Sequence, residues 1–129
     1  MSGHGVLQGK WTSGSGKDTI ETFLPIYSFV EDGINYAICP PLDITGYGNS
    51  EPEAKGSLGI MIGEFFDYTI KKRTFLSELT RLGWTVKKKK KLIAPAIEEI
   101  ARKDPNFADI LNNKNYTVEQ SPINMPIAV

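Results

Sequence analysis

The stretch IETFLPIYSFVEDGINYAICPPLDITGYGNSEPEA, residues 20–54, decides the fold. Residues 20–30 and 34–39 are rich in β-branched and aromatic residues, which favour strands. Asp32-Gly33 between them is a dipeptide typical of tight hairpin turns. This part of the chain therefore predicts an antiparallel β-hairpin.

A third strand and a helix are expected directly after the hairpin. Pro40 and Pro41 cannot donate ladder hydrogen bonds, so strand pairing should stop there, and residues 42–48 read as the next strand. Ser50 can cap the free N–H groups of a helix, and Glu53 can reach back to the N–H of the cap residue. These signals predict a helix that begins just after Ser50.

Apolar residues then recur at helical spacing, which indicates one face packed on a core. Gly56, Gly59 and Gly63 lie in the same helix, where each costs up to ~1 kcal/mol relative to alanine. They indicate either a close approach of the helix to the sheet or a dimer face. The fold expected is α+β, with a small antiparallel sheet of three or four strands packed on one long helix.

The rest of the chain divides by composition. We expect a flexible, glycine- and serine-rich lead-in over 1–18, the β-β-β-α domain over 19–83, and a basic strand or arm with short helices and an extended C-terminal tail over 84–129. Pro122 and Pro126 favour an edge strand or an arm for the tail, because a central strand needs every N–H.

Composition excludes several classes of protein. The 129 residues are 40% hydrophobic and 23% charged, which is unlike a disordered tail, a collagen or a coiled-coil rod. Cys39 is the single cysteine and His4 the single histidine, so neither a disulfide framework nor a multi-cysteine zinc site is expected. No run approaches the ~20 apolar residues of a membrane span. The N-terminus lacks a signal-peptide core, so we expect a cytoplasmic protein without cofactors.

Catalytic patterns are weak. GSGK at 14–17 resembles part of a phosphate-binding loop, but Trp11 stands where that loop needs glycine and Asp18 where it needs serine or threonine. Cys39 follows an apolar strand and lacks a candidate histidine base, which favours a buried spectator. The carboxylates of the β-β-β-α unit are explained by turns, capping and the helix dipole, and we expect no enzymatic activity.

The formal net charge of zero is an average over unlike segments. Residues 71–91 hold nine cations and one carboxylate, whereas residues 1–70 hold three cations and nine carboxylates. The basic segment contains Trp84 and the run Lys87, Lys88, Lys89, Lys90 and Lys91. Three interpretations remain open: lysines that prevent edge pairing, phosphate binding with Trp84 stacked on a base, and contact with the acidic part of a second copy.

The order of elements in 20–70 carries a family resemblance. The residues that fill it are Asp32-Gly33, YAICP at 36–40, Leu42, Gly48-Asn49-Ser50, Glu51, Glu53-Ala54 and Leu58. In this order and spacing they resemble the HicB-like antitoxin family of bacterial type II toxin–antitoxin systems, over about residues 22–70. The resemblance implies a partial ribonuclease H-like fold without nuclease activity, which binds and neutralises a small basic mRNA-cleaving toxin.

Three functional hypotheses follow. The first is an antitoxin-like binding module that meets a basic toxin through an acidic face containing Asp32, Asp43 and Glu51. The second is a nucleic-acid-binding or transcription-regulating protein that uses residues 71–91. The third is a weak metal-dependent nuclease on the same scaffold. A homodimer through the glycine-bearing helix is compatible with each of them.

Overall fold

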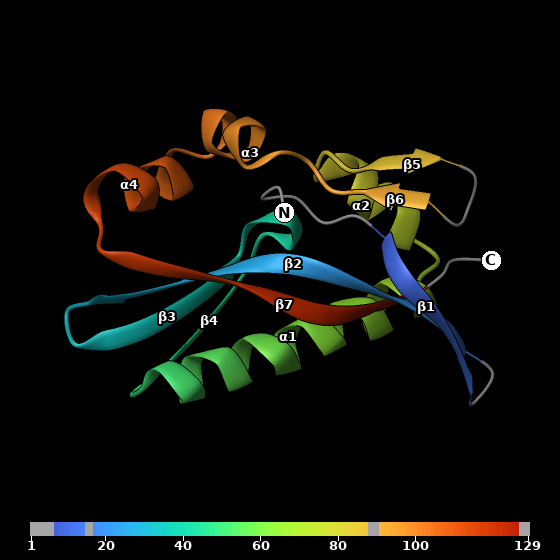
Figure 1. Ribbon diagram of the computed structural model, residues 1–129, viewed down its shortest axis with the longest axis horizontal. Coiled ribbons are helices and arrows are strands. Elements are labelled where there is room, and N and C mark those ends of the chain that lie inside the picture. Colours follow the sequence, from blue (N-terminus) through green and yellow to red (C-terminus); the bar gives the residue numbers. More distant parts are fainter. Residues whose placement is uncertain (1–6, 15–16, 88–90, 127–129) are drawn as a thin grey trace.

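The computed structural model describes residues 7–14, 17–87 and 91–126. Strands and helices follow one another in an α+β arrangement (Figure 1). The strands are β1 (Leu7–Gly14), β2 (Lys17–Glu31), β3 (Ile34–Cys39), β4 (Ile44–Gly48), β5 (Thr85–Lys87), β6 (Lys91–Ile93) and β7 (Tyr116–Pro126). The helices are the short 3₁₀ helix η1 (Pro40–Leu42), α1 (Glu51–Lys71), α2 (Phe75–Arg81), α3 (Ile97–Lys103) and α4 (Pro105–Asn113).

The long strand β2 organises the main sheet. One side of β2 pairs with β7 from Thr19 to Phe29, and the other side pairs with β1 near its start and with β3 near its end, all antiparallel. β4 follows β3, so the main sheet has five strands. Pro25 lies in the part of β2 that neither β1 nor β3 reaches, where a missing N–H breaks no ladder on that side.

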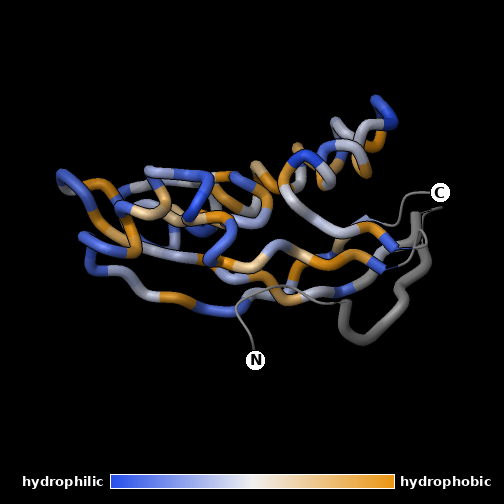
Figure 2. Tube along the Cα trace, turned by 90° about the horizontal axis from the view of Figure 1, so that it is seen from above, coloured by the Kyte–Doolittle hydropathy of each residue, from blue (hydrophilic) through white to orange (hydrophobic). Residues whose placement is uncertain are grey.

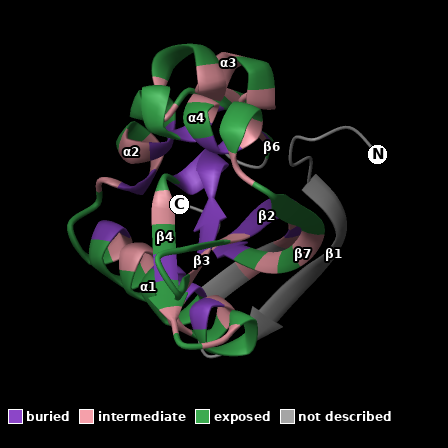
Figure 3. Ribbon diagram, turned by 90° about the vertical axis from the view of Figure 1, so that its left-hand side faces the viewer, coloured by how far each residue is buried: buried purple, intermediate pink, exposed green. Residues whose placement is uncertain are grey.

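Helices cover both faces of the sheet (Figures 1 and 3). α1 packs on one face through Ala54, Leu58 and Ile62, and its core also includes residues of α2 and of the β5–β6 hairpin. On the other face, Phe107 and Ile110 of α4 pack against Tyr27 and Ile38. The trace in Figure 2 carries hydrophobic stretches with hydrophilic residues between them, and β2 holds the apolar run FLPIY at 23–27. Such a run is expected of a strand whose two faces are both covered.

Small residues allow α1 to lie close to the sheet. Ser28, Ala37, Gly46 and Thr117 are directly opposite one another on four adjacent strands, so they share one face. A Cβ atom at Gly46 would overlap the Leu58 backbone nitrogen and lie 2.6 Å from the Ala54 carbonyl oxygen. The close approach of helix and sheet therefore occurs at a glycine of β4.

The β-β-β-α order and the helix start are confirmed. Asp32 and Gly33 both have positive φ angles, as a two-residue hairpin turn requires. The Ser50 hydroxyl accepts a hydrogen bond from the Glu53 N–H at 3.2 Å, as expected of the cap. The Glu53 side chain accepts one from the N–H of Asn49, the residue before the cap, and not from the N–H of Ser50 as predicted. The third strand begins two residues late, because η1 occupies Pro40–Leu42.

The two ends of the chain differ from expectation. Within the proposed lead-in over 1–18, residues 7–14 form β1 and pair with β2. Within the proposed extension over 84–129, β7 is an edge strand, as its prolines predicted, but it completes the main sheet. The main sheet therefore has five strands, one more than the upper number expected, and residues 84–129 contribute the fifth.

Candidate interaction surfaces

Four aromatic residues form a row across the sheet. Phe29 of β2 is directly opposite Tyr36 of β3 and Tyr116 of β7, and Tyr36 is directly opposite Tyr47 of β4. Residues opposite one another in a sheet point to the same face. We call Phe29, Tyr36, Tyr47 and Tyr116 the aromatic row.

The aromatic row lies on the α4 face of the sheet, beside the part that α4 covers. Tyr27 and Ile38 pack against α4. Tyr27 is two residues from Phe29 along β2, and Ile38 is two residues from Tyr36 along β3. The Phe29 and Tyr36 rings stack with centroids 5.2 Å apart and planes 18° apart. Tyr47 is 64% exposed and Tyr116 is 38% exposed. The row thus has a stacked pair at its centre and an accessible tyrosine at each end.

Carboxylates gather at the same end of the molecule, where the β2–β3 turn, the start of α1, the start of β7 and the end of α4 meet (Figure 1). We call this the acidic end; it contains Glu31, Asp32, Glu51, Glu53, Asp109 and Glu119, and the lysines Lys55 and Lys114. Each lysine is shared by two carboxylates. Lys55 pairs with Glu51 at 2.7 Å and with Glu119.

On the aromatic side of this end, Lys114 lies 3.2 Å from Glu31 and 4.0 Å from Asp109. Asp32 is exposed in the neighbouring turn. Glu51, Glu119 and Lys55 lie on the α1 face of the sheet, so the charge beside the aromatic row comes from Glu31, Asp32, Asp109 and Lys114, which together carry an excess of negative charge.

The predicted toxin-facing residues are only partly brought together. Asp32 precedes β3 and Glu51 follows β4, which places both at the acidic end. Asp43 lies at the opposite end of β3, about 17 Å away for a strand of this length. There the pKa of the Asp43 carboxyl is raised by burial and by Asp104, and lowered by Arg81. The structure therefore brings Asp32 and Glu51 to one end of the molecule and places Asp43 at the other end of β3.

The basic segment divides among three elements in the opposite half of the molecule (Figure 1). Lys71 ends α1, and Arg81 ends α2 and is paired with Glu78 at 2.9 Å. Lys87 ends β5 and Lys91 begins β6. Lys87 and Lys91 are directly opposite one another at its last described pair. Lys88, Lys89 and Lys90 lie outside the described residues.

Trp84 is not available to stack on a base. Its side chain is 4% exposed, and its indole N–H donates a hydrogen bond of 2.8 Å to the carbonyl oxygen of Pro41. The ring packs in the core between α1 and the β5–β6 hairpin. The predicted nucleic-acid contact at Trp84 is therefore wrong, because the indole ring is buried and hydrogen-bonded to η1.

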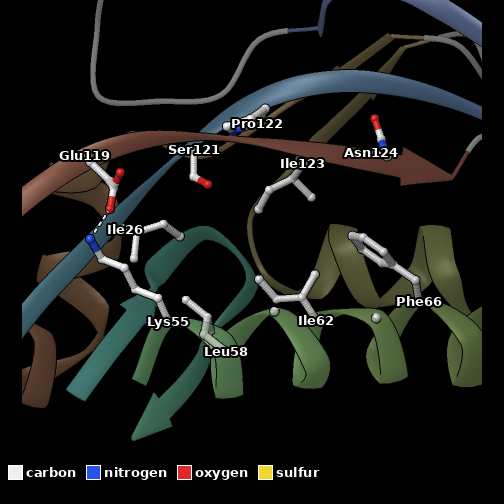
Figure 4. Close-up of a pocket in the computed structure, with 12 residues that line it drawn as sticks. Ile26, Lys55, Leu58, Ile62, Phe66, Glu119, Ser121, Pro122, Ile123 and Asn124 are labelled. Atoms are coloured by element: carbon white, nitrogen blue, oxygen red, sulfur yellow. Dashed lines mark ion pairs between the residues drawn. The ribbon is translucent and has the colours of Figure 1, made fainter. Parts of the chain in front are cut away.

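A groove of about 320 Å³ lies between α1 and β7. Figure 4 shows Leu58 and Ile62 pointing from α1 towards β7, with Ile123 facing them and the Lys55–Glu119 pair at one end. Gly59 and Gly63 line it as well.

The glycines of α1 do not serve helix–sheet packing. A Cβ atom at Gly56, Gly59 or Gly63 would meet no atom within 4 Å, so the interpretation of these glycines as a close approach to the sheet is wrong. All three positions are exposed. The dimer face remains a prediction.

Other chemistry is sparse among the described residues. Cys39 is fully buried, and burial raises the pKa of its thiol to about 12. No three histidine, cysteine or carboxylate side chains come together as metal ligands in the part of the chain that the structure describes. Within the same residues, no helix is long and apolar enough to cross a membrane.

No protein-family model, curated protein or solved structure matches the chain.

The aromatic row was missed by sequence reasoning. One pair of the row was predictable from the sequence. Phe29 and Tyr36 are equally distant from the centre of the Asp32-Gly33 turn, so they must pair if that turn has two residues. Tyr116 has no comparable local signal.

Proposed function

We propose that this chain is a non-enzymatic binding protein, an antitoxin-like module that binds and neutralises a small basic mRNA-cleaving toxin. The proposal starts from the resemblance of residues 22–70 to HicB-like antitoxins. Strands β2, β3 and β4 and helix α1 follow one another in the order on which that resemblance rests. A domain of this kind acts by contact with a protein partner.

The observation that carries the proposal is the separation of charge. Carboxylates outnumber lysines at the acidic end, whereas the basic segment lies in the other half of the molecule. Complementary charge accelerates encounter and selects partners of opposite sign. A basic protein would approach the acidic end, and the aromatic row supplies apolar contact area beside it.

Co-expression with a small basic protein encoded beside this chain tests the proposal. We expect the two to purify as one complex, and we expect this chain to restore growth when that neighbour is toxic. The double variant E31K/D32K should weaken the complex. Glu64→Lys, on the exposed part of α1, introduces a cation elsewhere and should leave it intact. Absence of a complex with the wild-type chain would contradict the proposal.

A second candidate function, nucleic-acid binding, is favoured by the hairpin lysines. Lys87 and Lys91 are exposed and directly opposite one another, and like charges opposite in a ladder destabilise it. A polyanion would relieve this repulsion. Replacement of all five lysines of 87–91 by glutamine should abolish a salt-sensitive gel shift of DNA or RNA.

Replacement of Arg102 and Lys103 of α3 by glutamine is the control for this second candidate and should change the gel shift little. Unchanged nucleic-acid binding by the five-lysine variant would rule out the hairpin as the contact.

A further inference from the structure

We infer that the aromatic row binds arginine side chains presented by a basic protein segment. This inference rests on the proposed function and names the chemical group that the surface selects. A guanidinium group is planar, stacks on aromatic rings and donates paired hydrogen bonds to carboxylates. The row and the carboxylates beside it provide both kinds of contact on one face.

The geometry of the row suits stacking. Its four side chains occupy adjacent strands, which lie about 4.8 Å apart, so all four rings project from one face of the sheet. The pair Phe29–Tyr36 is already stacked, which fixes the orientation of the two central rings. At one end of the row, Tyr116 packs against Tyr27 with centroids 5.4 Å apart. Three of the four rings are therefore held by aromatic neighbours before a ligand binds, and Tyr47 is the most exposed of the row.

Flanking residues extend the surface without covering it. Ile34 is 38% exposed and Val118 is 46% exposed, and both lie on the same face as the row. Together they form an apolar patch with a charged rim, the composition expected of a recognition site. Aromatic and arginine side chains are also the residues most enriched at the centres of protein interfaces.

The charge around the patch selects the occupant. Glu31 is on the same face as the row, two pairs nearer the turn, and Asp32 follows it. Lys114 is occupied by Glu31 and Asp109, so the rim is acidic. Exposed aromatic side chains on a sheet can also stack on nucleic-acid bases, but carboxylates beside them would repel phosphates. A cationic peptide segment fits both features, and arginine fits them better than lysine.

The test is a calorimetric titration of the full chain with two synthetic peptides of equal length and charge, in which arginine or lysine alternates with serine. We expect the arginine peptide to bind at least about fivefold more tightly. Tyr47→Ala should remove this preference, whereas Tyr47→Phe should keep it, because the ring face makes the contact.

Tyr68→Ala is the matched control. Tyr68 is 63% exposed, almost as much as Tyr47, but it lies on α1 at the other face of the sheet. It should leave both affinities unchanged. Thermal unfolding of each variant checks that the fold is intact. Equal affinities for the two peptides, equal effects of the two alanine variants, or tighter binding of a single-stranded RNA oligonucleotide would overturn the inference.

The same variants separate this inference from the proposed function. If the co-expressed basic partner binds the wild type and the Y47A variant equally well, arginine recognition by the row is wrong while the proposed function stands. If no such partner binds the wild type, the proposed function fails, and the peptide titration still decides whether the row selects arginine.

Discussion

The indole N–H of Trp84 and the carbonyl oxygen of Pro41 form a buried hydrogen bond of 2.8 Å between residues 43 positions apart. Pro41 lies in η1, beside the third strand, and Trp84 directly precedes β5. The bond therefore connects the basic hairpin to the β-β-β-α unit, and it explains why a tryptophan next to a lysine run is structural.

Trp84→Phe should keep most of the packing but leave the Pro41 carbonyl buried without its donor. We expect a loss of about 1–3 kcal/mol in the free energy of unfolding. Chemical denaturation followed by circular dichroism measures it. Tyr68→Phe, which removes a polar group at an exposed site, should change the stability by less than about 0.5 kcal/mol. Equal stability of W84F and the wild type would show that the bond contributes nothing.

Two glycine substitutions should have opposite effects. Gly46→Ala places a Cβ against the backbone of α1, 2.7 Å from the Leu58 Cα. This overlap should lower the free energy of unfolding by about 1–3 kcal/mol. Gly59→Ala meets no neighbour and removes a glycine from the interior of α1, so it should stabilise the protein by about 0.5–1 kcal/mol. Melting temperatures of the two variants test the pair. A destabilised G59A variant would show that α1 needs this glycine.

Because the thiol of Cys39 is buried, we expect the free energy of unfolding to depend on pH. Its pKa is raised from 9.0 to about 12, so the fold favours the protonated thiol. This contribution to stability is complete below pH 9 and is lost as the pH rises from 9 towards 12. The stability difference between the wild type and Cys39→Ala should therefore shrink between pH 8 and pH 10.5.

Tyr27, whose pKa is raised mainly by burial, is present in both proteins and cancels from this comparison. A difference that stays constant over this pH range would contradict the prediction. Iodoacetamide should also alkylate Cys39 much faster in the unfolded chain than in the folded one.

We expect removal of the charge at Asp43 to stabilise the protein. Because its pKa is raised, the fold disfavours the charged carboxylate, and the penalty appears as the pH rises above 3.8. Asp43→Asn keeps an amino acid that tolerates the observed φ of 56° and removes the charge. D43N should be more stable than the wild type at pH 7 and equal to it below about pH 4.

Asp32→Asn provides the control for Asp43, since Asp32 has a similar φ of 54° in the β2–β3 turn. If both variants gain the same stability at pH 7, the amide and not the lost charge is responsible.

Local signals predicted the centre of the fold well. The Asp32-Gly33 turn, the two strands around it and the capped start of α1 each depend on residues close together in the sequence, and they are confirmed. The position of β7 could not be predicted, because its pairing with β2 joins residues about a hundred positions apart. The aromatic row was hidden for the same reason, since it exists only once β7 and β4 are in register.

One of the two interpretations of the α1 glycines, and the role of Trp84, were predicted wrongly from the sequence. A glycine in a helix has the same cost whether it faces a sheet or open space, so Gly56, Gly59 and Gly63 could not be assigned from the pattern alone. Trp84 stands beside cations in the sequence, but its burial is decided by η1, far away along the chain.

The pairing of β2 with β7 has a consequence for synthesis of the protein. While the chain emerges from the ribosome, β2, β3, β4 and α1 are all complete before residues 116–126 exist. During that interval the side of β2 that later pairs with β7, from Thr19 to Phe29, has no neighbouring strand, and unpaired edges are prone to aggregation. A nascent chain should therefore depend on chaperones until β7 arrives, and Tyr116 reaches the sheet only with that last strand.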